Sequence, residues 1–423
     1  MKDSGIPYLG PVPTSWDVQK LRYSVKWKSE KGYPDAEVLA LYRDYGVIPK
    51  SSRDDNHNVT SLDTSTYKYV EIGDFVINKM KAWQGSMGVS SYSGIISPAY
   101  HVCSITNDDI HRPYFHYLLR NVAYLPEFAR LSTGLRIGQW DLSFDDFRNL
   151  PFLLPDKSEQ ERIANLLDTK CAEIDNVVEQ TCATIEEYKK LKQVIITEAV
   201  TKGVRGARPM KPSGVEWVGD IPEEWEACKL KYLLAEKLTY GANEIADGYN
   251  PSHPRYIRIT DIAENGKLKD SSVQSLLPEI AEPYLLKKGD ILLARSGATA
   301  GKSFLFNEDF EACFAGYLIR ARVNNKITPE YLYYYTKSKI YINWCQIIQI
   351  QSTIQNISGD KYINLMVTEP SEDEQQEIAA YLDSKCAEID RIIEMKEQLI
   401  EELGSYKKSL IYEYVTGKKE VTA

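Results

Sequence analysis

The sequence predicts an α+β protein in which two globular units alternate with two long helices, arranged as a pseudo-twofold internal repeat. Three observations support this fold class. Residues 159–203 align with residues 374–418 without a gap, and nearly half of the aligned positions are identical. Each of these repeats has helical apolar periodicity along its length. The segments before them, 1–155 and 206–370, instead carry strand and turn signatures.

The composition is that of a globular protein with more than one domain. The chain has 423 residues, with 43% hydrophobic and 26% charged side chains. No apolar run approaches the ~20 residues of a membrane-spanning helix, so we expect no membrane segment. The N-terminus has no apolar core typical of a secretory signal. Seven cysteines are scattered without a C-x-x-C pair, which argues against a zinc site or disulfides and favours the cytoplasm.

The globular segments are expected to resemble each other in outline and to differ in detail. A weaker match aligns Gly10 with Gly219 and Trp16 with Trp225. Both segments contain a Gly-Asp strand, and both contain a helix that begins at a proline, Pro113 or Pro329. Strands are predicted at 38–42, 73–77, 102–105, 255–259, 289–293 and 317–323.

The segments 156–205 and 371–423 are predicted to be single long helices. Each begins after a proline with a capping-box pattern, Asp156-x-x-Glu159 or Ser371-x-x-Glu374. Glycines offer natural stops near residues 203 and 417. We expect the helices to pair in antiparallel fashion; the alternative is that each packs only on its own globular unit. The pairing stripe comprises Ile163, Leu167, Ile174, Val178, Ile185, Ile378, Leu382, Ile389, Ile393 and Ile400.

The net charge of −9 is unevenly distributed along the chain. Most of the acidity lies in the helical segments, chiefly 371–423, whereas the globular segments are nearly balanced. Each globular segment can therefore present a basic face. We expect the non-specific affinity of the isolated chain for DNA to be weak.

No catalytic or metal site is predicted. Residues 297–303 resemble a phosphate-binding loop, but only three residues separate the glycines where four are required. The corresponding stretch 80–86 has no lysine after its glycine, so a tight turn between strands is expected instead. The five histidines have no metal-ligand spacing. We expect neither a cofactor nor a metal on this chain.

Two loops have side chains suited to reading bases. Residues 349–356 are rich in amides and hydroxyls, which can bond to base edges. Residues 133–140 provide arginine, glutamine and a stacking indole. Together with basic and polar residues at strand ends, the candidate DNA contacts are Arg43, Lys79, Lys81, Trp83, Gln84, Arg136, Gln139, Trp140, Arg258, Thr260, Arg295, Ser296, Lys302, Gln351, Ser352, Thr353, Gln355 and Asn356.

These features together resemble the specificity subunit of type I restriction-modification systems. The resemblance rests on the duplicated plan, the Gly10 to Trp16 opening, the Gly-Asp strand, and the motif Pro-x-x-x-Glu-Gln-x-x-Ile-Ala at 155–164 and 370–379. It spans essentially the whole chain. Lys79 and Met80 stand where the second half has Arg295 and Ser296, a minor departure from the family pattern.

The resemblance implies a non-catalytic protein that recognises double-stranded DNA. The globular segments would be target-recognition domains, each reading half of an asymmetric bipartite target, and the helices would be spacers. Two modification subunits, similar to adenine-N6 methyltransferases that use S-adenosylmethionine, would dock on the chain. Separate restriction subunits would supply an ATP- and Mg-dependent motor and nuclease. Two other hypotheses remain at this point: a coiled-coil adaptor that binds only proteins, and a fused nuclease or methyltransferase.

Overall fold

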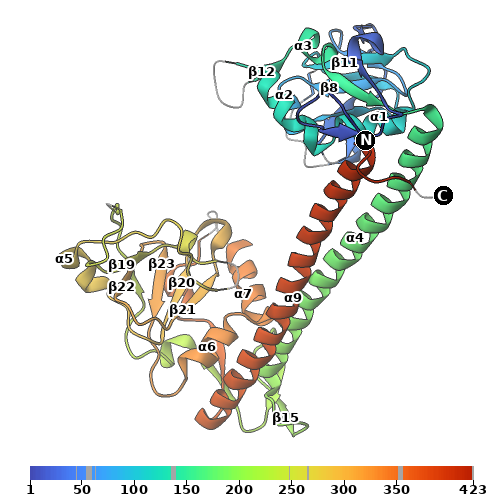
Figure 1. Ribbon diagram of the computed structural model, residues 1–423. Helices are drawn as coiled ribbons and strands as arrows, with labels where there is room; N and C mark the ends of the chain where they lie inside the picture. The colour runs from blue at the N-terminus through green and yellow to red at the C-terminus, as the bar shows by residue number, and fades with distance from the viewer. Residues whose placement is uncertain are drawn as a thin grey trace. The chain divides into compact units, whose positions relative to one another are not determined.

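The computed structural model describes residues 1–43, 45–53, 60–61, 63–134, 140–246, 248–263, 266–350 and 356–421. The chain forms two compact units, unit 1 (1–181 with 397–423) and unit 2 (182–396). Both long helices cross this division: α4 (Lys157–Lys202) and α9 (Glu372–Val415) each contribute one part to each unit (Figure 1). The protein is therefore α+β with two units. Within the described ranges, no helix is both long and apolar enough to cross a membrane.

Unit 1 is built on a four-stranded antiparallel sheet. Its strand order is β4 (Val25–Lys28), β11 (Tyr100–Ile105), β8 (Phe75–Asn78) and β9 (Met87–Val89). The short helices are α1 (Arg112–Leu119), α2 (Leu125–Leu131) and α3 (Phe144–Arg148). Two-stranded pairs complete the unit: β1 (Lys2–Asp3) with β2 (Pro11–Val12), β3 (Asp17–Lys20) with β14 (Pro151–Leu154), β5 (Leu39–Tyr42) with β6 (Gly46–Pro49), β7 (Lys68–Val70) with β10 (Gly94–Ile96), and β12 (Ser132–Thr133) with β13 (Asp141–Leu142).

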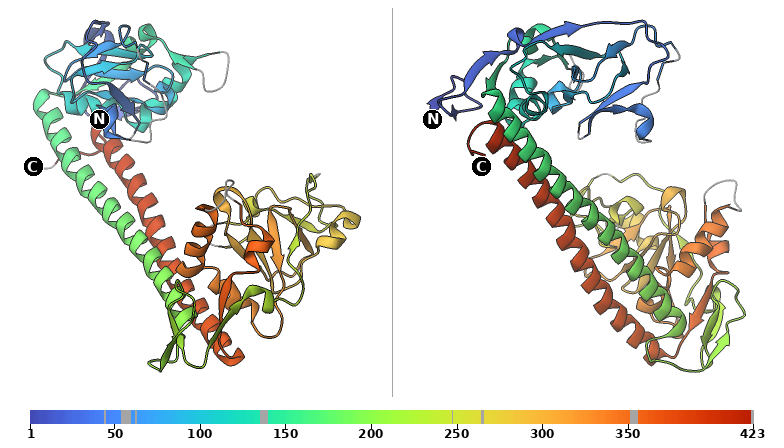
Figure 2. Two further views of the ribbon diagram at one scale, coloured as in Figure 1. Left: turned by 180° about the vertical axis from the view of Figure 1, so that it is seen from behind. Right: turned by 90° about the vertical axis from the view of Figure 1, so that its right-hand side faces the viewer.

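The core of unit 1 joins the sheet to the long helices. Ile163, Leu167 and Ile174 of α4 pack in one apolar cluster with Leu410 and Tyr414 of α9 and with residues of the sheet. The N-terminal hairpin lies beside the end of α9 (Figure 2), where the ammonium of Lys418 donates to the carbonyl of Leu9 at 2.8 Å.

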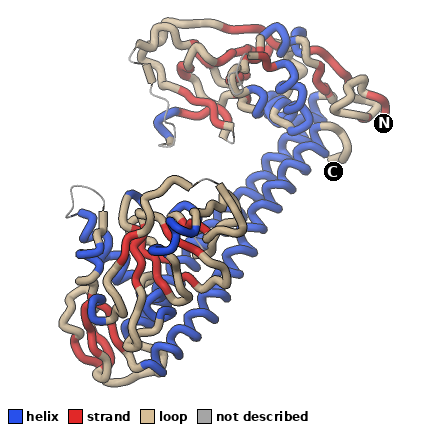
Figure 3. The backbone as a smooth tube through the Cα atoms, turned by 90° about the vertical axis from the view of Figure 1, so that its left-hand side faces the viewer, coloured by secondary structure: helices blue, strands red, loops and turns tan. Residues whose placement is uncertain are grey.

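Unit 2 repeats this plan. Its main sheet has the order β18 (Thr239–Tyr240), β23 (Leu318–Ala321), β20 (Asp290–Ala294) and β21 (Ser303–Phe306). Figure 3 distinguishes its strands, in red, from its helices, in blue. The remaining elements are β15 (Met210–Pro212) with β16 (Asp220–Pro222), β17 (Glu226–Lys229) with β24 (Met366–Glu369), β19 (Arg255–Ile257) with β22 (Ala312–Phe314), α5 (Pro278–Ala281), α6 (Pro329–Tyr335), α7 (Lys339–Ile350) and α8 (Gly359–Tyr362).

The strand pairing beside the main sheet is the same in both units. In unit 1, β10 pairs antiparallel with β7, and its Ile95 forms a parallel bridge with Val38. In unit 2, β22 pairs parallel with β19, and its Cys313 forms an antiparallel bridge with Leu285. The duplicated framework therefore keeps its pairing away from the helices, where the two sequences diverge most.

The Gly-Asp signature marks the same turn in both sheets. Asp74 and Asp290 follow glycines whose φ angles are 92° and 88°, a left-handed conformation that favours glycine. Their carboxylates accept the backbone amides of Glu71 at 2.8 Å and of Lys287 at 2.7 Å. Asp290 also pairs with Arg322 at 2.7 Å. The motif therefore closes the turn that starts β8 or β20.

The Glu-Gln motif ties each long helix to its globular unit. The Gln160 side-chain amide donates to the carbonyls of Pro155 at 2.8 Å and Asp109 at 3.0 Å, and its oxygen accepts the amide of His111 at 2.9 Å. Gln160 is fully buried. One side chain thus fixes the start of α4 to the start of α1.

Gln375 makes the same three bonds in unit 2. It donates to the carbonyls of Pro370 at 2.9 Å and Lys326 at 2.8 Å, and it accepts the amide of Thr328 at 2.6 Å. Thr328 is the N-cap of α6. The motif therefore has a structural role that explains its duplication.

The helix ends agree with the sequence analysis except in one detail. Asp156 and Ser371 accept the amides three residues later, at 3.0 and 3.4 Å. The predicted capping box is wrong for the second helix, because the Glu374 carboxylate accepts from Trp225 Nε1 at 2.9 Å and pairs with Arg208. The buried indole N–H of Trp225 and the Arg208 guanidinium thus engage the carboxylate that would otherwise complete the cap.

Candidate nucleic-acid interface

In unit 1, the loop after β8 lies against the hairpin β12–β13. The Leu142 amide donates to the Lys79 carbonyl at 3.0 Å, and Lys79 Nζ pairs with Asp141 Oδ2 at 3.0 Å. Lys79 and Asp141 are partly exposed, so this pair can exchange for a phosphate at low free-energy cost. The structure thus places the strand-end loop beside the hairpin whose strands flank residues 135–139, which lie outside the described residues.

Two tryptophans join these segments. Trp83 lies in the short 3₁₀ helix Ala82–Gln84, and its ring meets that of Trp140 edge to face, with centroids 5.2 Å apart. Among the described residues, the buried Trp83 Nε1 has no hydrogen-bond partner. An unpaired buried donor in this position offers a hydrogen bond to an incoming acceptor.

The remaining unit 1 candidates are more loosely placed. Arg43 and Lys81 are exposed, and Gln84 is half-buried. The Arg43 carbonyl accepts a hydrogen bond from the Arg120 guanidinium, which fixes the backbone after β5. Arg136 and Gln139 lie outside the described residues.

In unit 2, the loop after β20 adjoins the segment that follows α7. Ser296 pairs with Asn356 as an isolated β-bridge, and the Ile357 amide donates to the Arg295 carbonyl at 2.7 Å. The Arg295 guanidinium lies over the Tyr240 ring, 5.0 Å from its centroid. Within the described ranges, Arg295 Nε and Asn356 Oδ1 are buried without a partner. A free donor and a free acceptor therefore occur together, as reading a base edge requires.

The other unit 2 candidates do not form one cluster with these. Arg258 is held by Asp261 through bonds of 2.7 and 3.0 Å and by the Ser272 carbonyl at 2.9 Å, and the hydrogen bond to Asp261 raises its pKa. Its guanidinium is engaged within the unit. Thr260 and Lys302 are exposed. Gln351, Ser352, Thr353 and Gln355 lie outside the described residues.

The two interfaces occupy equivalent places in the duplicated framework. In each unit, the loop after β8 or β20 contacts the segment just before the short helix α3 or α8. Those helices correspond, because the Asn149 side chain donates to the Asp145 carbonyl at 2.7 Å and Asn364 donates to Asp360 at 2.9 Å. The side chains at these places nevertheless differ between the two units.

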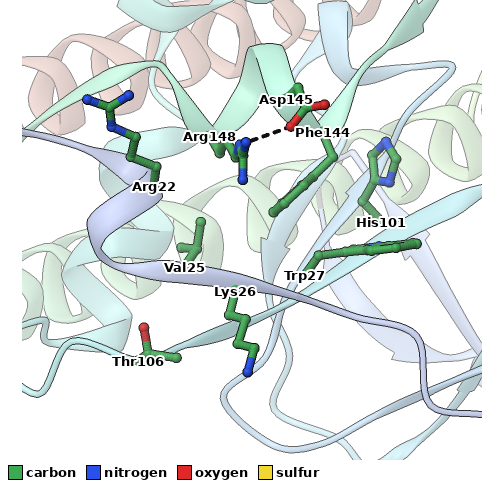
Figure 4. A pocket seen from close by; sticks show the side chains of 9 residues that line it. All are labelled: Arg22, Val25, Lys26, Trp27, His101, Thr106, Phe144, Asp145 and Arg148. Carbon is green, nitrogen blue, oxygen red and sulfur yellow. Dashed lines mark ion pairs between the residues drawn. The ribbon is translucent and has the colours of Figure 1, made fainter.

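Sequence reasoning missed a basic and aromatic groove in unit 1. It has a volume of about 710 Å³ and lies along β4 and α3 (Figure 4). The string Lys26-Trp27-Lys28, which interleaves cations with an indole, was the available signal. The lining residues are Arg22, Val25, Lys26, Trp27, His101, Thr106, Phe144, Asp145 and Arg148.

Residues 297–303 form a turn between strands, as predicted. A 3₁₀ turn at Gly297–Thr299 connects β20 to β21. In the part of the chain that the structure describes, no group of three or more His, Cys, Asp or Glu side chains is arranged to hold a metal ion.

The predicted pairing residues are buried to different degrees. Ile163, Leu167 and Ile174 belong to the unit 1 core, and Ile378 and Leu382 belong to the unit 2 core. Ile185 and Ile389 are buried, whereas Val178, Ile393 and Ile400 are half-buried.

Comparison with known proteins identifies related chains. A family model described as a type I restriction modification DNA specificity domain matches residues 16–187 and 222–404. The specificity subunit of the type I restriction enzyme MjaVIII of Methanocaldococcus jannaschii is 26% identical over 65% of this chain and 63% of that protein, which is less than two thirds of its length. The MjaX specificity subunit of the same organism, itself described as putative, is 22% identical over 98% of this chain and 96% of that protein.

A solved structure has the same fold. It comes from work on complex assembly and conformational transition of the type I restriction-modification system, and it aligns with a TM-score of 0.73 at 15% identity, over 97% of this chain and 100% of that chain.

Proposed function

Because this chain belongs to the family of type I restriction-modification DNA specificity domains, we propose that it is the non-catalytic subunit that selects the DNA sequence for such a complex. The observation that carries the proposal is a duplicated framework with divergent loops. Gln160 and Gln375 make the same three bonds, whereas the ion pair Lys79–Asp141 of unit 1 is replaced by Arg295 and Asn356 at the equivalent place in unit 2.

Each unit would read one half of a bipartite target. An arginine with free donors suits guanine, and a carboxamide such as that of Asn356 suits adenine. Two indoles with one free N–H provide a different surface. The half-sites should therefore differ, so the complete target is asymmetric.

The long helices would pair in antiparallel fashion and set the spacing between the half-sites. Two ion pairs support this arrangement: Asp175 with Lys407 at 2.6 Å in unit 1, and Lys192 with Asp390 at 2.6 Å in unit 2. In the repeat alignment, Asp175 corresponds to Asp390 and Lys192 to Lys407. The same contact is thus made twice, as an antiparallel pair with twofold symmetry requires. If the helices hold the two units on one face of the duplex, the half-sites that they contact lie about one helical turn apart.

The catalytic steps would belong to partner subunits. We propose that two modification subunits bring S-adenosylmethionine and that restriction subunits bring ATP- and Mg-dependent motor and nuclease activity. Acidic helices and balanced globular units suggest that the partners neutralise much of the DNA charge. For the compartment, the scattered cysteines favour the cytoplasm.

Mapping methylated adenines in cells with and without the gene tests this proposal. One bipartite motif should lose methylation on deletion and regain it on complementation. Loop exchanges at 133–140 or 349–356 should each alter one half of that motif. Unchanged methylation after both exchanges would favour the adaptor that binds only proteins.

A further inference from the structure

The groove along β4 and α3 combines exposed rings with positive charge. Trp27 is 52% exposed although it is one of the largest apolar side chains, and its ring lies 6.4 Å from that of Phe144. Figure 4 shows Phe144 between Trp27 and Arg148. A protein surface that leaves an indole open beside a second ring provides a stacking platform.

Cations surround this platform. Arg22, Lys26 and Arg148 line the groove against one carboxylate, Asp145, which pairs with Arg148 at 2.9 Å. Lys26 is exposed and forms no ion pair with a described residue. The His101 ring also lines the groove. Burial lowers its pKa below the ordinary value, so the ring adds no positive charge at neutral pH. The net positive charge therefore fits an anion that also carries a planar ring.

The duplication shows that the fold does not require these side chains. Alignment of α3 with α8 places Gly359 at the position of Phe144 and Ile363 at that of Arg148. The register of the second sheet places Leu238, which precedes β18, at the position of Trp27.

The backbone at one end of the groove is nevertheless the same in both units. The Leu21 amide donates to the Leu150 carbonyl at 2.9 Å, and the Leu230 amide donates to the Leu365 carbonyl at 2.8 Å. Unit 2 keeps the framework without the rings or the third cation. The groove is therefore a feature added to unit 1 alone.

The groove is continuous with the candidate interface of unit 1. Its His101 Nε2 lies 3.0 Å from the carbonyl oxygen of Leu142, whose amide binds the loop after β8. Phe144 follows Leu142 by two residues, directly after hairpin β12–β13. A DNA strand that leaves the unit 1 reading site thus has a route to the stacking platform.

We propose that this groove binds an unpaired stretch of DNA strand next to the half-site read by unit 1, with a base stacked on Trp27 and Phe144 and its phosphate held by Arg22, Lys26 and Arg148. A paired duplex keeps its bases stacked inside and would use only the cations. The proposal rests on the proposed function only in placing DNA on unit 1. Among its described residues, unit 2 has neither these rings nor the third cation at the equivalent positions, so the complex would hold opened DNA on one side of its target.

The test measures binding of a short fluorescein-labelled oligodeoxythymidine to the full chain by fluorescence anisotropy at low salt. Trp27→Leu and Arg148→Ile introduce the residues of unit 2, so both should fold. Trp27→Leu should weaken single-strand binding by about 5- to 150-fold, since stacking on one ring is worth about 1–3 kcal/mol per base. The matched control is Trp217→Leu, which replaces a tryptophan 44% exposed in unit 2 and should bind like wild type.

Three results would overturn the proposal. The first is a Trp27→Leu chain that binds the single strand like wild type. The second is an equal loss for single-stranded and duplex oligonucleotides, which would make the groove a duplex contact. The third is displacement by thymidine 5′-monophosphate at the same concentration as by the oligonucleotide, which would make it a free-nucleotide site. Loss of single-strand binding alongside an intact methylation motif would separate this site from the sequence-reading function.

Discussion

Replacing Gln375 with methionine would remove three hydrogen bonds from the start of α9 while keeping the length of the side chain. Gln375 is fully buried and connects the Pro370 carbonyl, the Lys326 carbonyl and the Thr328 amide. Methionine can satisfy none of them. The Thr328 amide would lose its acceptor at the N-cap of α6, and the Pro370 carbonyl would lose a buried donor.

The size of the effect follows from these two groups, of which the Pro370 carbonyl is buried and the Thr328 amide is half-buried. An unsatisfied buried polar group costs about 1–3 kcal/mol, and the exposed Lys326 can recruit water for its carbonyl. We therefore expect the free energy of unfolding of unit 2 to fall by about 3 kcal/mol. For a unit of this size, such a loss lowers the melting temperature by about 6–12 °C.

Differential scanning calorimetry of the full chain measures this change. Gln376→Met is the matched control on the same helix, because Gln376 is the next residue of unit 2 and its side chain is exposed. The control should melt within about 1 °C of wild type. Equal melting of the Gln375 variant and wild type, or an equal loss in both variants, would refute the structural role of the Glu-Gln motif.

Three further perturbations test separate parts of the structure. Reversing the charge of Asp175 or of Lys407 alone should lower the free energy of unfolding, and exchanging the two charges should restore it. A double-mutant cycle should give a coupling energy of about 0.2–1 kcal/mol between the two residues, and zero coupling would argue against this register of α4 on α9. Burial, reinforced by nearby lysines, lowers the pKa of Lys337 to about 8 from 10.5. Between these two pH values the unfolded chain binds more protons than the folded chain, so the free energy of unfolding of wild type should rise with pH across that window. The rise should be smaller in Lys337→Met, and urea unfolding at several pH values measures it. Parallel profiles of the two proteins would contradict the lowered pKa. Arg295→Ala should weaken specific DNA binding by the assembled complex about tenfold or more, whereas Lys302→Ala should weaken specific and non-specific binding alike; equal behaviour of the two variants in competition assays would remove Arg295 from base reading.

The long helices were the most predictable part of the fold. Their apolar periodicity and terminal glycines are local signals: α4 and α9 begin one residue after the predicted starts and end one or two residues before the glycines at 203 and 417, so α9 stops short of the predicted segment end at 423. The Gly-Asp strands were equally predictable, because the left-handed glycine and the aspartate that accepts a backbone amide three residues earlier lie within one short turn. The sequence analysis did not resolve α7, α8 or the parallel pairing of β19 with β22, because short elements gain most of their stability from tertiary contacts.

The candidate interface was predictable only in part. Strand-end residues such as Lys79 and Arg295 could be identified because the duplicated Gly-Asp strand marks their position. The engagement of Arg258 by Asp261 depends on a local turn that composition does not reveal. The groove beside Trp27 needs β4 and α3, which lie more than a hundred residues apart in the sequence, to meet in space.

The central claim is that each unit reads one half of the target. It is tested most directly by replacing residues 1–155 with the corresponding segment of a relative that has a different target, and mapping methylated adenines in cells that supply the partner subunits. We predict a hybrid motif in which one half changes while the other half and the spacing stay the same. A motif that is unchanged, or one that changes in both halves, would contradict the claim.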